Sequence, residues 1–167
     1  MTKLIRAVLI LVTLGVSFSS FGVGEAVADR FHDGMVAYNA RDYATAFREF
    51  LPLAQAGDWN AQDALGLMYE KGLGIPQNYK KAVKWYRLAA KQGNFQAQYD
   101  LGLMYANGHG VGQDDVRAFM WVNLAAAGND EAAKELHTVA AKLAPAQIAQ
   151  AKEMAAKCKA ASFRKCN

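Results

Sequence analysis

Three glycines in the stretch LGLMYEKGLGIP, residues 65–76, form the pattern in this sequence that most suggests chemistry. Glycine-rich turns can cradle a phosphate with their backbone N–H groups. Such a loop follows a strand and usually carries a Lys-Ser/Thr pair at the start of the next helix, and neither feature is present here. The pattern also occurs twice, because GHGV at 108–111 repeats GLGI at 72–75. The duplication favours a turn between helices, in which glycine adopts a positive φ or packs under a neighbouring helix, over a phosphate site.

The other residues with reactive side chains do not form a recognisable catalytic or metal-binding set. His32, His109 and His137 show no H-x-x-x-H spacing and are interpreted as surface or helix-end histidines. The acidic pairs Asp114-Asp115 and Asp130-Glu131 stand where helices are expected to start, and the helix dipole favours negative charge there. The sequence therefore predicts no catalytic residue, no cofactor and no metal, and we expect that the chain is not an enzyme.

The first 28 residues have the features of a secretory signal peptide. Two basic residues precede the apolar run Ala7–Val16, and the small-x-small sequence AVA at Ala26–Ala28 suits cleavage. The mature chain would then begin at Asp29 and would be secreted or periplasmic. An uncleaved anchor is the alternative, because Ala7–Val23 is 17 residues without a charge, slightly short for a membrane span. No later segment resembles a membrane helix.

The two cysteines, Cys158 and Cys166, lie in the last ten residues. An oxidising compartment would permit a disulfide between them. On one continuous helix their Cα atoms would lie about 12 Å apart, which is beyond the reach of a disulfide. A bond therefore requires the helix to end between the two cysteines, and a pair of free thiols is the alternative.

The charge of the chain gives little support to nucleic-acid binding. The net charge is +4 and the pI is about 9.1, which is only mildly basic. Lys80, Lys84 and Arg87 share one side of a predicted helix and are interpreted as a solvated outer face. Because the chain is also expected to be exported, no nucleic-acid partner is predicted.

A repeat of 36 residues organises the chain. The segment AQDALGLMYEKGLGI at 61–75 returns as AQYDLGLMYANGHGV at 97–111. Each unit contains two stretches of helical periodicity, and Ala61, Leu65 and Tyr69 fall on one face of the first. Aromatic residues at repeat positions are predicted to be core, namely Tyr69, Trp85, Tyr86, Tyr105 and Trp121. A glycine C-cap followed by an N-capping side chain is expected between units, at Gly57-Asp58, Gly93-Asn94 and Gly128-Asn129.

The repeated unit resembles the Sel-one-like repeat, a relative of the tetratricopeptide repeat. The family pattern A-x-x-x-L-G-x-x-Y-x-x-G-x-G-V-x-x-D-x-x-K-A-x-x-W-Y-x-x-A-A-x-x-G is matched over 61–93, with Ile75 for Val and Asn78 for Asp. It is matched again over 97–128 with more departures. The resemblance implies an all-α, right-handed α/α solenoid of about four helix pairs, with a C-terminal capping helix at 145–158.

The implied organisation is a signal peptide at 1–28, a tetratricopeptide-like first helix pair at 29–57, repeat units at 58–93 and 94–128, and a divergent last unit with the C-terminal cap at 129–167. In the related repeat family the first helix of each pair lines a concave binding side. The variable first-helix positions are therefore the predicted protein-binding surface: Asn60, Asp63, Glu70, Lys71, Gln96, Tyr99, Asn107, Glu131, Lys134 and Thr138. This set is polar and mixed in charge, which suits a peptide or protein segment.

The resemblance implies an adaptor or regulatory scaffold in the cell envelope that binds another protein of unknown identity. An enzyme is the competing class, because one exported, Cys-rich branch of the family is associated with β-lactam binding or hydrolysis. That branch carries a cysteine pair in each repeat, and the repeats of this chain carry none. A purely structural envelope component is the third class.

Overall fold

The computed structural model describes residues 21–164 and residue 166, with side chains from Arg30 onward. Every regular element in this part of the chain is a helix, which confirms the predicted all-α class. The helices are α1 (Phe21–Asn39), α2 (Tyr43–Gln55), α3 (Trp59–Lys71), α4 (Tyr79–Ala90), α5 (Phe95–Asn107), α6 (Asp115–Ala125), α7 (Asp130–Ala140) and α8 (Pro145–Ala160). Residues 1–20 of the predicted signal peptide lie outside the described residues, so export remains a prediction. Among the described helices, none has both the length and the apolar character needed to cross a membrane.

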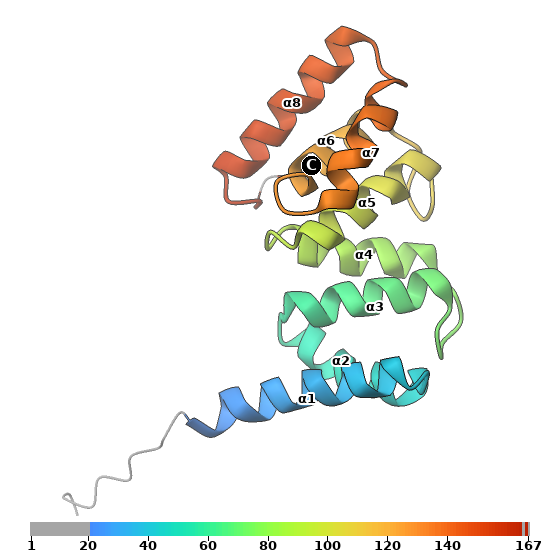
Figure 1. Ribbon diagram of the computed structural model, residues 1–167, viewed down its shortest axis with the longest axis vertical. Helices are drawn as coiled ribbons and strands as arrows, with labels where there is room; N and C mark the ends of the chain where they lie inside the picture. The colour runs from blue at the N-terminus through green and yellow to red at the C-terminus, as the bar shows by residue number, and fades with distance from the viewer. Residues whose placement is uncertain (1–20, 165, 167) are drawn as a thin grey trace, which may run out of the picture.

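Consecutive helices from α1 to α7 pack side by side in a stack that runs from α1 at one end to α7 and α8 at the other (Figure 1). α1 packs with α2, α3 with α4, and α5 with α6, and successive pairs are joined by contacts of α2 with α3 and of α4 with α5. α3 also contacts α5 directly. The first helices of these two pairs therefore approach each other across the layers. We call the side formed by α1, α3, α5 and α7 the first-helix face.

Aspartate and asparagine side chains start the repeat helices, as the sequence predicts. Asp58, Asn94 and Asn129 each accept a hydrogen bond from the backbone N–H three residues later, at 2.8–2.9 Å. Asn78 and Asp114 do the same at the starts of α4 and α6. Each bond satisfies an amide that has no partner within its helix. The starts of both helices in each repeat are thus determined by local sequence.

The glycine-rich turns have a structural role. Gly72 ends α3 in the left-handed conformation, with φ of 70°. Gly74 also has a positive φ, and a Cβ added there would lie 2.7 Å from the Cβ of Tyr43. Gly110 takes the same position one repeat later, against the backbone of Tyr79. Each turn therefore combines a positive φ with close packing on the first turn of the preceding second helix, and only glycine permits both.

One predicted glycine cap is not formed. Gly57 and Gly93 have positive φ after the ends of α2 and α4, as expected. Gly128 does not have a positive φ, so the prediction of a left-handed C-cap is wrong there. A Cβ on Gly128 would instead overlap the ring of Phe95. The missing side chain thus makes room for the aromatic residue that begins α5.

α7 and α8 close the C-terminal end of the stack, and both pack on α6. α8 begins at the predicted residue, Pro145, and ends at Ala160. Because the helix ends before Cys166, the chain turns back and joins Cys166 to Cys158 in a disulfide with a Cα–Cα distance of 4.7 Å. The turn between the two cysteines brings the ring of Phe163 against Gly93, which follows the end of α4.

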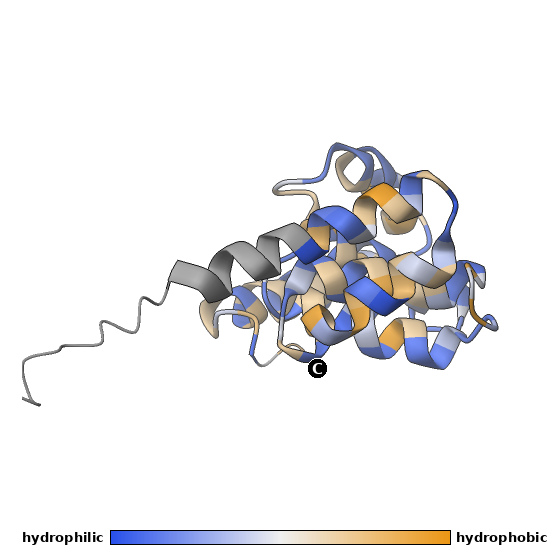
Figure 2. Ribbon diagram, turned by 90° about the horizontal axis from the view of Figure 1, so that it is seen from below, coloured by the Kyte–Doolittle hydropathy of each residue, from blue (hydrophilic) through white to orange (hydrophobic). Residues whose placement is uncertain are grey.

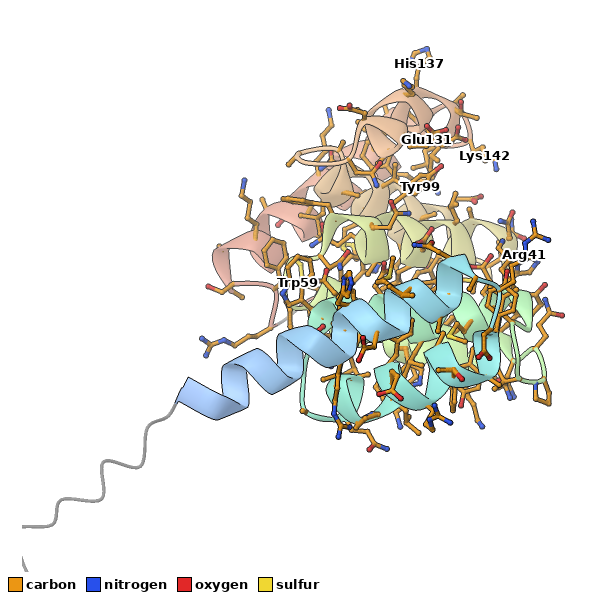
Figure 3. All side chains as sticks on the ribbon, turned by 60° about the horizontal axis from the view of Figure 1, so that its bottom comes forward. Arg41, Trp59, Tyr99, Glu131, His137 and Lys142 are labelled. Carbon is orange, nitrogen blue, oxygen red and sulfur yellow. A yellow bond between two sulfur atoms is a disulfide. The ribbon has the colours of Figure 1, made fainter. Side chains whose placement is uncertain are left out.

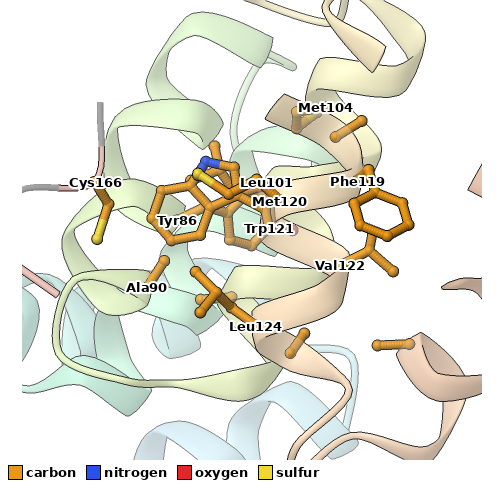
Figure 4. Packing of buried hydrophobic residues seen from close by; sticks show 14 of the residues in the cluster. Tyr86, Ala90, Leu101, Met104, Phe119, Met120, Trp121, Val122, Leu124 and Cys166 are labelled. Carbon is orange, nitrogen blue, oxygen red and sulfur yellow. The ribbon is translucent and has the colours of Figure 1, made fainter. Parts of the chain in front are cut away.

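The hydrophobic core runs through the middle of the stack. Tyr86, Leu101, Met120 and Trp121 are buried and lie together between α4, α5 and α6 (Figure 4). Gly66 lets α3 approach α4 closely, since a Cβ there would meet the Tyr86 ring. The helices carry both hydrophilic and hydrophobic positions along their length (Figure 2), so each has an apolar side for packing and a polar side. Tyr86 and Trp121 are therefore core, as predicted, whereas the other predicted core aromatics, Tyr69, Trp85 and Tyr105, are half-buried.

Candidate binding face

The first-helix face contains a groove between α1 and α3. α1 contributes side chains at a helical spacing of i, i+4 and i+7, and α3 contributes a matching row at i, i+3, i+4 and i+7. The groove has a volume of about 240 Å³, and one residue of α2 also lines it. Its lining residues are Phe31, Met35, Tyr38, Phe50, Asn60, Asp63, Ala64 and Leu67. The surface is therefore mainly apolar, with one carboxylate in its wall.

The Asp63 side chain is partly buried in this wall, and one of its two carboxylate oxygens lacks a hydrogen-bond partner among the described residues. Its Oδ1 atom is buried and has no hydrogen-bond partner among the described residues. Burial, and next the negative charge of Asp100 on α5, raises the pKa of Asp63 to about 7. Because the ionised form is disfavoured by both effects, this carboxylate holds its proton far more readily than an exposed aspartate does.

Asp100 and Glu70 extend the acidic surface beyond Asp63. Burial raises the pKa of Asp100 to about 6, with a further contribution from the charge of Glu70, while a hydrogen bond from Gln96 opposes the increase. The Gln96 amide donates to Asp100 Oδ2 at 3.1 Å. Lys71 forms an ion pair with Glu70. The carboxylates outnumber the cations in this part of the face, although the whole chain is positively charged.

Tyr86, on α4, reaches the same region from the second helix of its pair. The Tyr86 hydroxyl donates a hydrogen bond to Glu70 Oε2 at 2.8 Å. Burial, followed by the charges of Asp100 and Glu70, raises the pKa of Tyr86. The hydroxyl therefore remains a donor, and it fixes one oxygen of Glu70. The bond links the polar face to the core, because the ring of Tyr86 packs against Gly66.

Polar contacts continue toward α7. The Asn129 amide donates to Gln96 Oε1 at 2.9 Å, across the boundary between two units. Tyr99 lies near Glu131 in the same part of the face (Figure 3). Burial, followed by the charges of Glu135 and Glu131, raises the pKa of the Tyr99 hydroxyl. The variable positions of neighbouring first helices thus meet at one surface.

The structure brings together some of the predicted binding residues and leaves others apart. Asn60 and Asp63 share the groove, Glu70 and Lys71 form a pair, and Gln96 and Tyr99 lie toward α7 with Glu131. Asn107 stands at the end of α5, and Lys134 and Thr138 are exposed on α7. Nothing measured on the molecule establishes binding at any of these residues, so the assignment of the face remains a prediction.

Sequence reasoning missed Asp100 and the whole α1 side of the groove. Asp100 occupies the place of Ala64 in the preceding unit, beside Tyr99, which replaces Asp63. Two adjacent changes inside an otherwise repeated stretch were a usable signal for a functional position. Phe31 and Met35 offered no such signal, because the repeat pattern is weak over the first helix pair.

The other chemical candidates take structural or solvated positions. His109 stacks on the ring of Tyr79, with centroids 4.5 Å apart, and so helps to dock the second glycine-rich turn. His32 and His137 are exposed. Lys80 and Lys84 are exposed on α4, as expected for a solvated face. Arg87 is instead half-buried and donates a hydrogen bond to the Tyr105 hydroxyl at 3.0 Å, so the prediction is wrong for that residue. Within residues 21–164 and 166, no group of three or more His, Cys, Asp or Glu side chains could hold a metal ion. The geometry of the first-helix face is therefore suited to binding, through apolar contact and charge.

Comparison with known proteins agrees with the repeat analysis. The family model described as "Sel1 repeat" matches residues 59–94 and 95–130. The fold is similar to that of c5321, whose crystal structure displays an SLR fold. That protein is a protective antigen present in uropathogenic Escherichia coli strains. That comparison has a TM-score of 0.77 and 25% identity, over 82% of this chain and 31% of that chain. The fold is also similar to a Sel1 repeat protein from Oxalobacter formigenes, with a TM-score of 0.63 and 32% identity, over 67% of this chain and 46% of that chain.

The chain thus spans less than half the length of either of these solved proteins. No curated protein matches the sequence. The predicted resemblance to Sel-one-like repeats is confirmed by the family model and by both structures, and so is the helical solenoid.

Proposed function

Because residues 59–130 form two Sel1 repeats, a scaffold that commonly mediates protein–protein interaction, we propose that this chain is an exported adaptor that binds a protein or peptide segment on its first-helix face. The role is regulatory or organising within the cell envelope. Export enters the proposal through the signal-peptide features of residues 1–28.

The observation that carries the proposal is the combination of an apolar groove and a partly buried carboxylate on the first-helix face. Its apolar groove and the buried, unpartnered oxygen of Asp63 are adjacent, and Asp63 is a variable position of the repeat. Buried polar groups in native proteins nearly always have a partner. Because the Asp63 side chain also lines the groove, its carboxylate is placed to interact with a donor from a bound molecule. The second helices present the exposed lysines of α4, and Asp115 on α6 also has a buried Oδ1 without a partner among the described residues. The adjacency of such an oxygen to an apolar groove, and not the oxygen alone, is therefore what distinguishes the first-helix face.

Site-specific photocrosslinking tests the proposal. A benzophenone amino acid is introduced at Asn60 or at Tyr99, and in a control variant at Lys84 on α4, in cells that express the full-length protein. We expect a discrete crosslinked partner from the first two positions, identified by mass spectrometry, and none from Lys84. Capture at Lys84 but at neither first-helix position would show that the binding face is wrongly assigned.

We further propose that the protein acts without catalysis. The enzymatic alternative, β-lactam binding or hydrolysis, was associated with a cysteine pair inside each repeat, whereas the single disulfide here joins residues that follow the repeats. A nitrocefin assay on the purified protein is expected to show no hydrolysis above buffer. Clear turnover would replace the adaptor proposal with an enzymatic one.

A further inference from the structure

The α1–α3 groove has the size of a site for one or two side chains. Its volume of about 240 Å³ lies below the roughly 300–1,000 Å³ that is typical of small-molecule and cofactor sites. Apolar atoms of Phe31, Met35 and Leu67 form much of its lining, and Met35 remains 36% exposed. Burying an apolar side chain of a partner against this surface would be favourable, because apolar area is removed from water.

The charged side chains around the groove are mainly acidic, and some of them form no ion pair among the described residues. Asp63 lies in the wall, where the charge of Asp100 acts on it, and the charges of Glu70 and Lys71 act in turn on Asp100. The ion pairs found among the described residues do not include Asp63 or Asp100. Lys71, the cation closest to the cluster, is already engaged by Glu70. The protein's own described side chains therefore leave Asp63 without a positive partner.

A cation supplied by a bound segment would change this balance. An ammonium or guanidinium group in the groove would pair with the Asp63 carboxylate where it lines the wall, and would offset the repulsion from Asp100. An acidic residue at the same place would add a third negative charge to two partly buried carboxylates. A neutral side chain would leave the negative charge of Asp63 without an opposite charge. Charge complementarity thus selects one class of occupant from the three.

We propose that the α1–α3 groove binds a segment of a partner protein in which an apolar side chain is adjacent to a lysine or arginine. The apolar side chain lies between α1 and α3, against Met35 and Leu67, and the cation pairs with Asp63. This inference rests on the proposed protein-binding function and specifies which partner sequences the face accepts.

Selection from a random peptide library displayed on phage tests the inference with the purified, folded protein as bait. We expect enriched peptides to share an apolar residue next to a lysine or arginine. In a direct binding assay, replacing that cation in a selected peptide with norleucine should weaken binding about tenfold, as expected for the loss of a close, partly desolvated charge pair.

Three variants locate the site. Asp63→Asn removes the charge with little change in shape and should abolish the preference for the cationic peptide over its norleucine analogue. Asp33→Asn makes the same chemical change at an exposed position on α1, and should leave that preference intact. Met35→Ser changes a partly exposed apolar residue and should weaken both peptides equally. Circular dichroism confirms that each variant is folded.

Distinct outcomes overturn the inference. It fails if selection enriches nothing, if acidic or uncharged peptides dominate, or if Asp63→Asn leaves the charge preference unchanged. It also fails if the protein self-associates in a manner abolished by Asp63→Asn, because the groove would then hold a second copy of the chain. A partner crosslinked at Tyr99, together with any of these results, would leave the proposed function standing and refute only the peptide chemistry. Failure of crosslinking at both first-helix positions would refute the proposed function itself.

Discussion

Replacing Asp63 with asparagine should stabilise the protein at neutral pH and not in acid. In the unfolded chain this carboxylate ionises near its ordinary pKa of 3.8, whereas in the folded protein burial and Asp100 raise the pKa to about 7. Between these values the folded state holds the proton more tightly than the unfolded state does. The free energy of unfolding therefore decreases as the pH rises from about 4 to about 7, and it stays at the lower level above that range.

The size of the effect follows from the difference between the two pKa values. At about 1.4 kcal/mol per pH unit, this difference corresponds to about 4 kcal/mol of lost stability above pH 7. At pH 5.5 the loss is about 2 kcal/mol by the same reasoning. Asparagine does not titrate, so Asp63→Asn avoids the loss. The effect of Asp100, whose pKa is raised to about 6, is present in both proteins and largely cancels in the comparison.

Urea unfolding at a series of pH values between 4 and 8, followed by circular dichroism, measures this difference directly. We expect the variant and the parent to have similar midpoints at pH 4, and the variant to unfold at clearly higher urea concentration at pH 8. Asp33→Asn, an equal loss of charge on an exposed part of α1, serves as the control and should show little change with pH. A constant difference between Asp63→Asn and the parent across the pH range would refute the reasoning, because it would mean that folding does not alter the titration of Asp63.

Three further predictions concern the fold and its processing. Gly74→Ala should destabilise the protein by about 2–4 kcal/mol, because Cβ would meet the first turn of α2 and φ is positive, whereas Gly112→Ala, with open space around it, should change stability by less than about 0.5 kcal/mol in the same urea assay. Serine at both Cys158 and Cys166 should lower stability by about 2–3 kcal/mol, and a reducing agent should lower the melting temperature of the parent but not of this variant. Intact-mass analysis of the protein from an envelope fraction should give a chain that begins at Asp29, and recovery of the uncleaved chain would contradict the predicted processing.

Much of the architecture could be predicted from the sequence because its determinants are local. The period of 36 residues is read directly from the chain. The capping side chains such as Asp58 and Asn94, and the helix-ending glycine Gly72, act through neighbours within a few residues. The capping residues and the positive φ of the glycines are therefore visible in a single unit, whereas the packing of Gly74 on Tyr43 is not. Gly128 shows the limit of this reasoning, because its role depends on the ring of Phe95, which belongs to the other end of the repeat.

The candidate site depends on relations that no local pattern contains. Asp63 was predicted as a variable surface residue, but its partial burial and its proximity to Asp100 arise from the contact between α3 and α5. The groove beside it requires α1 and α3 both to pack on α2, and Phe31 and Met35 were not identified as part of any site.

The sequence by itself thus determined which residues begin and end the helices and how often the unit repeats, since these features rest on backbone hydrogen bonds and steric limits over a few residues. Only the tertiary structure decided which carboxylates meet and where an apolar groove remains open. The pKa of a carboxylate depends on the burial and the charges around it, and these are set by side chains from helices that are separate in the sequence but adjacent in the stack.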